Sequence, residues 1–243
     1  MPSLEILNKS TLFATARQHM PSRRTLRGDG APPRLKGFQD AMAFGHIMQH
    51  YNMRNRAPLS VADVGGDQSR VLPFLLERGS NITGTITDTW SQSIGNGTIQ
   101  IPDPQTRISL IDTLVGTPEA HEKIQDNSFN VVTSISVVEH IPANALEAFF
   151  SDCLRICKPG GIILHYIDLH ISDSNQNERG TATAAALEAA YGPLKTSPNS
   201  WAFKSKYVSN PDSMMFNWGE RMDNMEFRAN NQAVCLVARH DCL

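Results

Sequence analysis

The stretch Leu59–Ser69 constrains the fold of this chain more than any other, and it reads Leu-Ser-Val-Ala-Asp-Val-Gly-Gly-Asp-Gln-Ser. It begins as an apolar run typical of a buried strand, breaks at two glycines and leads into the helix-like Val71–Arg78. A strand that breaks at glycine into a helix brings a polar ligand close to the main chain. The acid inside the apolar run, Asp63, is unusual and calls for a functional explanation.

From Leu59 onward, strand-like runs alternate with helical segments, which favours an α/β fold with a mostly parallel sheet. The predicted strands are Ser60–Val64, Ile82–Thr87, Arg107–Ile111, Phe129–Ile135 and Ile162–Ile167. The predicted helices are Arg70–Arg78, Asn144–Cys157 and Ala182–Tyr191. Near the end of the sequence, Asn230-Asn231-Gln232 is a tight-turn signal between Glu226–Ala229 and Ala233–Arg239. We therefore expect a C-terminal antiparallel β-hairpin.

Residues 1–58 are predicted to form an N-terminal helical extension to a domain that covers residues 59–243. Two helical stretches are expected there, Ser3–Gln18 and Leu35–Asn52. The extension is either a layer packed on the domain or a lid over a ligand, and the sequence leaves both open.

Composition narrows the classes of partner. The formal net charge of −2 lacks the basic field that binds nucleic acid through its phosphates. No apolar run approaches the ~20 residues that span a bilayer, and Met1–Met20 is too polar for a signal peptide. Four cysteines occur, none in a pair-of-pairs arrangement typical of zinc sites, and we expect reduced thiols. They are Cys153, Cys157, Cys235 and Cys242. These features favour a cytoplasmic protein that binds neither membranes nor nucleic acid.

Acids end three successive predicted strands, and they indicate the ligand class. Asp88 follows the second strand and Asp112 the third, at the edge where open α/β sheets bind ligands. The two oxygens of the Asp88 carboxylate suit a vicinal ribose diol, and Asp112 is placed to reach an adenine amino group. Asp63 suits a cationic amino group and is a poor neighbour for a pyrophosphate. The glycines also lack the G-x-G-x-x-G spacing of dinucleotide sites.

Four stretches taken together resemble the class I S-adenosylmethionine-dependent methyltransferases. They are Val61–Ser69, Thr85–Asp88, Ser128–His140 and Leu154–Tyr166. The first motif of that family is an acid, any residue, and then three glycines at alternate positions. Asp63 and Gly65 match it, while Asp67 and Ser69 stand where the later glycines are usual. The resemblance implies a Rossmann-like, mostly parallel seven-stranded sheet with helices on both faces.

The resemblance also implies the cofactor, S-adenosylmethionine, with S-adenosylhomocysteine as product. Asp63 would help to hold the methionine amino group, Asp88 the ribose, and the Asp112 region would border adenine. The main chain around Phe129–His140 would line the methionine side. The implied cofactor-binding residues are Asp63, Gly65, Gly66, Asp67, Ser69, Asp88, Asp112 and Ser134.

The acceptor side is less defined. His140 and His170 follow the fourth and fifth predicted strands, and either is a candidate general base for an oxygen or nitrogen acceptor, with a purely structural role left open. Residues 168–220 form the expected acceptor-side insertion, and its aromatic part favours a small molecule or glycan. No metal site is expected. Two other functions stay open, a nucleotide-dependent oxidoreductase and a degenerate methyltransferase fold that acts as a binding subunit.

Overall fold

The computed structural model of the protein describes residues 3–6, 35–66, 69, 71–89, 107–170, 174–193, 216–217 and 232–242. The backbone alone is described at residues 3–6, 35–38, 168–170, 174–181, 216–217 and 232–237. The strands are β1 (Ser3–Ile6), β2 (Leu59–Val64), β3 (Ile82–Asp88), β4 (Ile108–Asp112), β5 (Phe129–Ile135), β6 (Cys157–His170), β7 (Phe216–Asn217) and β8 (Gln232–Asp241). The helices are α2 (Leu35–Met53), α3 (Leu72–Arg78), α5 (Pro118–Lys123), α6 (Leu146–Ile156) and α7 (Ser174–Tyr191), with 3₁₀ turns at Val138–His140 and Ala143–Ala145.

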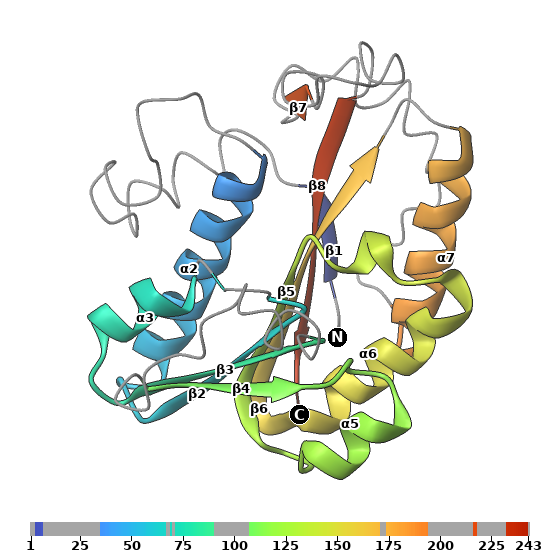
Figure 1. Ribbon diagram of the computed structural model, residues 1–243. Helices are drawn as coiled ribbons and strands as arrows, with labels where there is room; N and C mark the ends of the chain where they lie inside the picture. Colours follow the sequence, from blue (N-terminus) through green and yellow to red (C-terminus); the bar gives the residue numbers. More distant parts are fainter. Residues whose placement is uncertain are drawn as a thin grey trace, which may run out of the picture.

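These strands form one sheet in the order β1-β8-β6-β5-β2-β3-β4, with the short β7 paired to β8 (Figure 1). Strands β2 to β6 run parallel to their neighbours in that order. β8 pairs antiparallel with β6, β1 and β7. The predicted mostly parallel α/β sheet is confirmed. The described sheet has eight strands rather than the predicted seven, because β1 adds a strand beyond β8.

Helices cover both faces of the sheet, with α2 and α3 on one face and α5, α6 and α7 on the other (Figure 1). Successive side chains of a strand point to opposite faces, so each central strand contributes to two cores. Val61 and its register partner Val131 belong to the core under α2 and α3. Ala62 and its partner Val132 belong to the core under α6. Asp63, two residues after Val61, therefore faces the α2 side.

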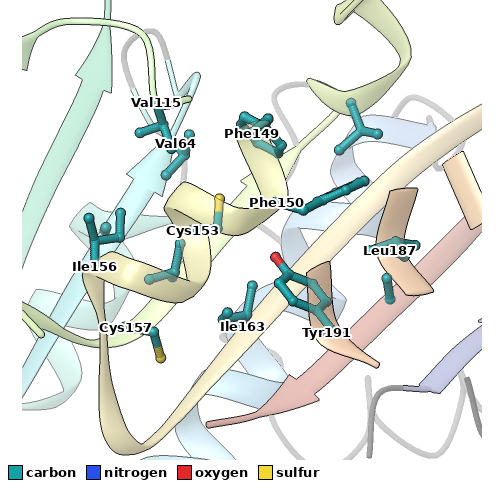
Figure 2. Close-up of a cluster of buried hydrophobic side chains, with 14 of the residues drawn as sticks. Val64, Val115, Phe149, Phe150, Cys153, Ile156, Cys157, Ile163, Leu187 and Tyr191 are labelled. Carbon is teal, nitrogen blue, oxygen red and sulfur yellow. The ribbon is translucent and has the colours of Figure 1, made fainter. Parts of the chain in front are cut away.

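The most regular helical pattern in the sequence becomes α6, two residues shorter at its start and one shorter at its end than predicted. Phe149, Phe150 and Cys153 are buried along one side of it. Figure 2 shows this side facing Ile163 of β6 and Leu187 and Tyr191 of α7. The helical repeat predicted the buried face correctly because apolar residues recur every three or four positions.

The N-terminal part differs from the prediction in two respects. The expected helix over Ser3–Gln18 is wrong at Ser3–Ile6, which form β1 and pair with β8 from Arg239 to Leu236. The helix over Leu35–Asn52 is confirmed as α2, and it supplies buried side chains to the core over β2 and β5. These are Met42, Ala43, Phe44, Ile47 and Tyr51. Helix α2 therefore forms part of the domain core. The proposed role of residues 1–58 as a lid stays a prediction.

The C-terminal antiparallel pairing is confirmed, with β8 running beside β6 for nine residue pairs. One predicted partner in the hairpin, Glu226–Ala229, lies outside the described residues. The short β7 pairs with Ala233 and Gln232 at the start of β8 instead. β6 begins earlier than predicted, because Lys158-Pro159-Gly160-Gly161 lies within the strand rather than before it.

A chain of hydrogen bonds crosses the core under α6 and α7. The Ser134 hydroxyl lies 2.8 Å from Nδ1 of His165, and Nε2 of His165 lies 2.9 Å from the Tyr191 hydroxyl. His165 is completely buried. Burial, followed by the charge of His240, lowers the pKa of His165 to about 3. The imidazole therefore stays neutral in the folded protein, where a ring nitrogen can accept one hydrogen bond while the other donates.

Acid should destabilise the fold through His165. Its pKa is lowered in the folded state, so below pH 6.5 the unfolded chain takes up a proton that the folded chain excludes. This group's contribution to stability is complete above that pH and falls by roughly 1.4 kcal/mol per pH unit down to the folded pKa. Burial lowers the pKa of His50 to about 4, which adds loss in the same window.

The measurement is urea unfolding of the wild type and His165→Gln between about pH 7 and about pH 4. His165→Gln should be less stable than the wild type at neutral pH. Its unfolding should take up about one proton fewer in acid, so its stability should fall less steeply as the pH is lowered. His140→Gln is the control, because the His140 side chain is 77% exposed. An unchanged slope in His165→Gln would contradict the assignment.

Candidate functional site

The carboxyl ends of β2, β3 and β4 lie side by side and bring the predicted acids to one edge of the sheet. Asp63 pairs with Ile86 of β3, and Val64 pairs with Thr87. One residue further along, Asp88 and Asp112 are direct register partners. In an open parallel sheet this edge is where ligands bind. The three acids that the sequence singled out are therefore neighbours on adjacent strands.

The Asp63 carboxylate lies against the turn that follows β2. The Asp63 side chain is 2% exposed. A Cβ added at Gly66 would stand 2.7 Å from Asp63 Cγ and 2.9 Å from Oδ2, closer than atoms pack. Only glycine at position 66 lets the carboxylate and the turn come this close. The pairing of an internal acid with a glycine three residues later thus has a direct steric cause.

Gly65 is required for two further reasons. Its φ of +68° lies in the left-handed region that side chains disfavour. A Cβ there would also stand 2.6 Å from a methyl group of Val137, just after β5. The Gly65 N–H donates to the carbonyl of Thr87 at 2.7 Å, which fixes the turn onto β3.

Ser69 takes the place of a glycine in conformation as well as in sequence. Its φ is +35°, and its side chain is buried. The Leu72 N–H donates to its hydroxyl at 3.2 Å, so this oxygen satisfies an unpaired N–H group at the start of α3. The Ser69 N–H in turn donates to the carbonyl of Gly66 at 2.6 Å. The hydroxyl is therefore directed at the helix, a role that the sequence interpretation missed.

Asp88 and Asp112 are half-buried at the ends of their strands. Oδ1 of Asp88 accepts the N–H of Thr89 at 2.8 Å. Main-chain carbonyls hold the strand ends in place: that of Asp88 accepts the Thr113 N–H at 2.9 Å, and that of Asp112 accepts Lys123 Nζ at 2.6 Å. The Asp88 carboxylate is thus positioned by its own backbone while it remains partly accessible.

Four other predicted site residues differ from the three acids in where the structure places them. Ser134 lies on the opposite face from Asp63, and its hydroxyl contacts His165 in the core, so only its main chain can face the edge. His140 ends a 3₁₀ turn, with Nε2 3.9 Å from the carboxylate of the nearly buried Glu139. His170 is the last residue of β6, and its side chain lies outside the described residues, as does all of Asp67.

Helix α2 brings polar groups to this edge that sequence reasoning missed. The Ser136 hydroxyl, just after β5, donates to Oε1 of Gln39 at 2.8 Å, and both side chains are buried. Ser136 has a φ of +56°. Nδ1 of His46 lies 2.7 Å from the Tyr166 hydroxyl of β6. No local pattern marks these pairs, because each joins residues about a hundred or more positions apart.

The residues present fit a nucleoside that carries a cationic amino group. The edge offers a buried carboxylate, a half-exposed glycine turn, and a second, partly accessible carboxylate on the next strand. A carboxylate attracts an ammonium group and accepts hydrogen bonds from ribose hydroxyls. It repels a pyrophosphate, which is the group that dinucleotide sites place at a glycine turn.

A comparison with protein-family models supports this interpretation. Residues 62–165 match the model described as "Methyltransferase domain". The matched segment is a methyltransferase domain. It runs from the residue before Asp63 to His165 and so includes the edge with all three acids. The class predicted from Asp63, Asp88 and the glycine turn is confirmed, and the family implies S-adenosylmethionine as the cofactor.

Several solved structures are similar to this chain. A putative sarcosine dimethylglycine methyltransferase from Galdieria sulphuraria is 13% identical, with a TM-score of 0.40, over 58% of this chain and 53% of that one. An O-methyltransferase family protein from Burkholderia thailandensis is 16% identical, with a TM-score of 0.42, over 86% and 60%. An arsenic(III) S-adenosylmethionine methyltransferase from Chlamydomonas reinhardtii is 13% identical, with a TM-score of 0.47, over 94% and 74%.

The matches thus span 53% and 60% of the first two of these proteins. A sequence search of curated proteins finds no match. Within the described residues, no three His, Cys, Asp or Glu side chains gather as a metal site would require. Among the helices that the structure describes, none has the length and apolar character needed to cross a membrane.

The two functions of Ser69 in this turn can be separated by mutation. Ser69→Ala removes the hydrogen bond from the Leu72 N–H and keeps a side chain at positive φ, so it should destabilise the fold by about 1 kcal/mol. Ser69→Gly also loses that hydrogen bond but relieves the backbone conformation, so its net cost should be close to zero. Urea unfolding measures both. Equal losses in the two variants would contradict the backbone assignment.

Proposed function

We propose that this protein is an S-adenosylmethionine-dependent methyltransferase that modifies an oxygen or nitrogen atom of a small molecule or glycan. The observation that carries the proposal is the contact of the Asp63 carboxylate with the Gly66 turn, one strand away from Asp88. An anionic group and a half-exposed glycine turn then meet at the edge where a nucleoside cofactor binds in such folds.

In this proposal each acid has one task. Asp63 holds the cationic methionine amino group, while Gly65 and Gly66 let the cofactor approach the main chain. Asp88 accepts hydrogen bonds from the ribose hydroxyls, and Asp112 borders the adenine. Asp67, Ser69 and the main chain of Ser134 complete the predicted cofactor site.

The cofactor supplies an activated sulfonium methyl group, which the acceptor atom attacks in line. The protein itself then aligns the acceptor and excludes water. Pre-ordered reactant geometry can remove a large part of the activation barrier. Gln39 and Ser136 support this assignment, because their buried hydrogen bond fastens α2 to the end of β5 beside the turn.

An acceptor hydroxyl or ammonium group must also lose a proton. The candidate bases are His140 and His170, at Nε2 or Nδ1 of a neutral imidazole. His140 stands beside Glu139 on the turn after β5, with its exposed Nε2 3.9 Å from the Glu139 carboxylate. Residues 168–220 are the proposed acceptor-side segment. The formal net charge of −2 favours an acceptor other than nucleic acid.

The alternatives differ in what they require of the same turn. A nucleotide-dependent oxidoreductase would need a pyrophosphate beside Asp63, which repels it. A degenerate subunit would be favoured if the residues at the glycine positions filled the cofactor space. Against this, the Ser69 hydroxyl is directed at the Leu72 N–H of α3.

Binding distinguishes these functions. The wild type, titrated with S-adenosylhomocysteine, should gain roughly 2.7 kcal/mol of stability at a hundredfold excess over the dissociation constant. NAD should give no gain. Asp88→Ala should weaken binding by about ten- to a hundredfold, because it removes hydrogen bonds to a charged acceptor worth roughly 1.5–3 kcal/mol. Thermal shift and calorimetry measure these effects.

Glu122→Ala is the matched control, since Glu122 is an exposed acid on α5. It should bind S-adenosylhomocysteine as the wild type does. Stabilisation by NAD alone would overturn the proposal in favour of an oxidoreductase. No response to either compound would favour a binding subunit.

A further inference from the structure

Two cysteines far apart in the sequence meet at the end of the sheet opposite the cofactor edge. Cys157 is the first residue of β6, and Cys242 directly follows β8. Cys242 is held there by two main-chain hydrogen bonds. The Gly160 N–H donates to its carbonyl at 2.7 Å, and its own N–H donates to the carbonyl of Gly161 at 2.9 Å. The backbone therefore fixes the position of Cys242 beside the turn after Cys157.

The two sulfur atoms lie closer than non-bonded sulfurs pack. Sγ of Cys242 is 2.6 Å from Sγ of Cys157, whereas a disulfide bond is about 2.05 Å long. Both residues are buried, at 2% and 5% exposure. A further approach of about half an ångström completes the bond.

Gly161 makes room for this approach. A Cβ added there would stand 2.9 Å from Sγ of Cys157 and 2.6 Å from the carbonyl oxygen of Asn130. Any larger residue would push the Cys157 sulfur or the strand away. The glycine after the turn is thus part of the geometry that brings the two thiols together.

The nearest other cysteine does not share this arrangement. Cys153, one helical turn before Cys157, is completely buried in the core under α6. Figure 2 shows its sulfur and that of Cys157 pointing to opposite sides of the end of α6. Cys153 packs instead in the same buried cluster as Tyr191. It therefore serves as an internal reference for selective chemistry at the pair.

We propose that Cys157 and Cys242 form a reversible disulfide, an oxidative modification that fastens the end of β8 to the start of β6. A peroxide is the oxidant, because a small molecule suits so enclosed a pair. One thiol gives up its proton and attacks the peroxide O–O bond to give a sulfenic acid, and the hydroxide that leaves takes up that proton to form one water. The second thiol displaces the hydroxyl from that sulfur, the S–S bond forms, and a second water leaves. Two thiols and one hydrogen peroxide thus become one disulfide and two waters.

The bond would close a covalent loop, since the two cysteines are 85 positions apart. A loop of this size restricts the unfolded chain strongly, so the oxidised protein should be more stable than the reduced one. The cofactor edge lies at the other end of the parallel strands, so oxidation should leave cofactor binding unchanged. The proposal does not rest on the proposed function. It departs from the expectation that all the thiols stay reduced.

The test treats the full chain with hydrogen peroxide under native conditions, removes the excess, unfolds the protein and alkylates the remaining thiols. Peptide mapping should show a Cys157–Cys242 crosslink that dithiothreitol reverses, with Cys153 still alkylated. The melting temperature should rise by about 4 °C or more on oxidation. Cys157→Ser and Cys242→Ser should lose both the crosslink and the shift, whereas Cys153→Ser should retain them.

Oxidation of the wild type in concentrated urea gives a second comparison with native oxidation, and this one needs no substitution. There the crosslinks should be distributed among the cysteines, so selective pairing of Cys157 with Cys242 must come from the fold. The proposal is overturned if both residues remain alkylated after native oxidation, or if the native pairing is as mixed as in urea. A crosslink without any change in melting temperature would overturn the inference that the disulfide stabilises the attachment of β8 to β6.

Discussion

The close packing of Asp63 against the Gly66 turn is the constraint on which the site depends. The apolar alternation of β2 places Asp63 on the α2 face, and no side chain at position 66 would leave room for its carboxylate. Gly65 then turns the chain at positive φ against Val137 and bonds to β3. The end of β2, the start of α3 and the turn after β5 are thereby fixed relative to one another. A carboxylate held in this position beside the turn attracts a cationic amino group.

The same constraint gives a physical reason for the ligand class. Strand register brings Asp88 and Asp112 next to each other beyond this turn, so negative charge gathers at one edge of the sheet. That edge suits an ammonium group and a ribose and disfavours a pyrophosphate. The methyltransferase domain matched over residues 62–165 covers this edge. Ser69 shows how the glycine pattern can change while the backbone keeps its path, because Ser69 adopts a positive φ and its hydroxyl accepts the first N–H of α3.

Many of the strands and helices could be predicted from the sequence because they depend on local patterns. β5 was predicted with its observed ends, since a run of β-branched residues is bounded by turn residues. The buried face of α6 followed from its helical repeat. The features that the sequence did not predict depend on distant partners. β1 has only four residues and is a strand because it pairs with β8 at the other end of the chain. The inward hydroxyl of Ser134 and the bond from Ser136 to Gln39 likewise require the folded sheet.

A crystal structure of the protein with S-adenosylhomocysteine bound tests the cofactor site most directly. In it, the ribose hydroxyls should contact the Asp88 carboxylate, the amino group should lie on the Asp63 side of the Gly65-Gly66 turn, and the adenine should lie beside Asp112. A ligand bound elsewhere, or an amino group turned away from Asp63 with the ribose away from Asp88, would contradict these assignments.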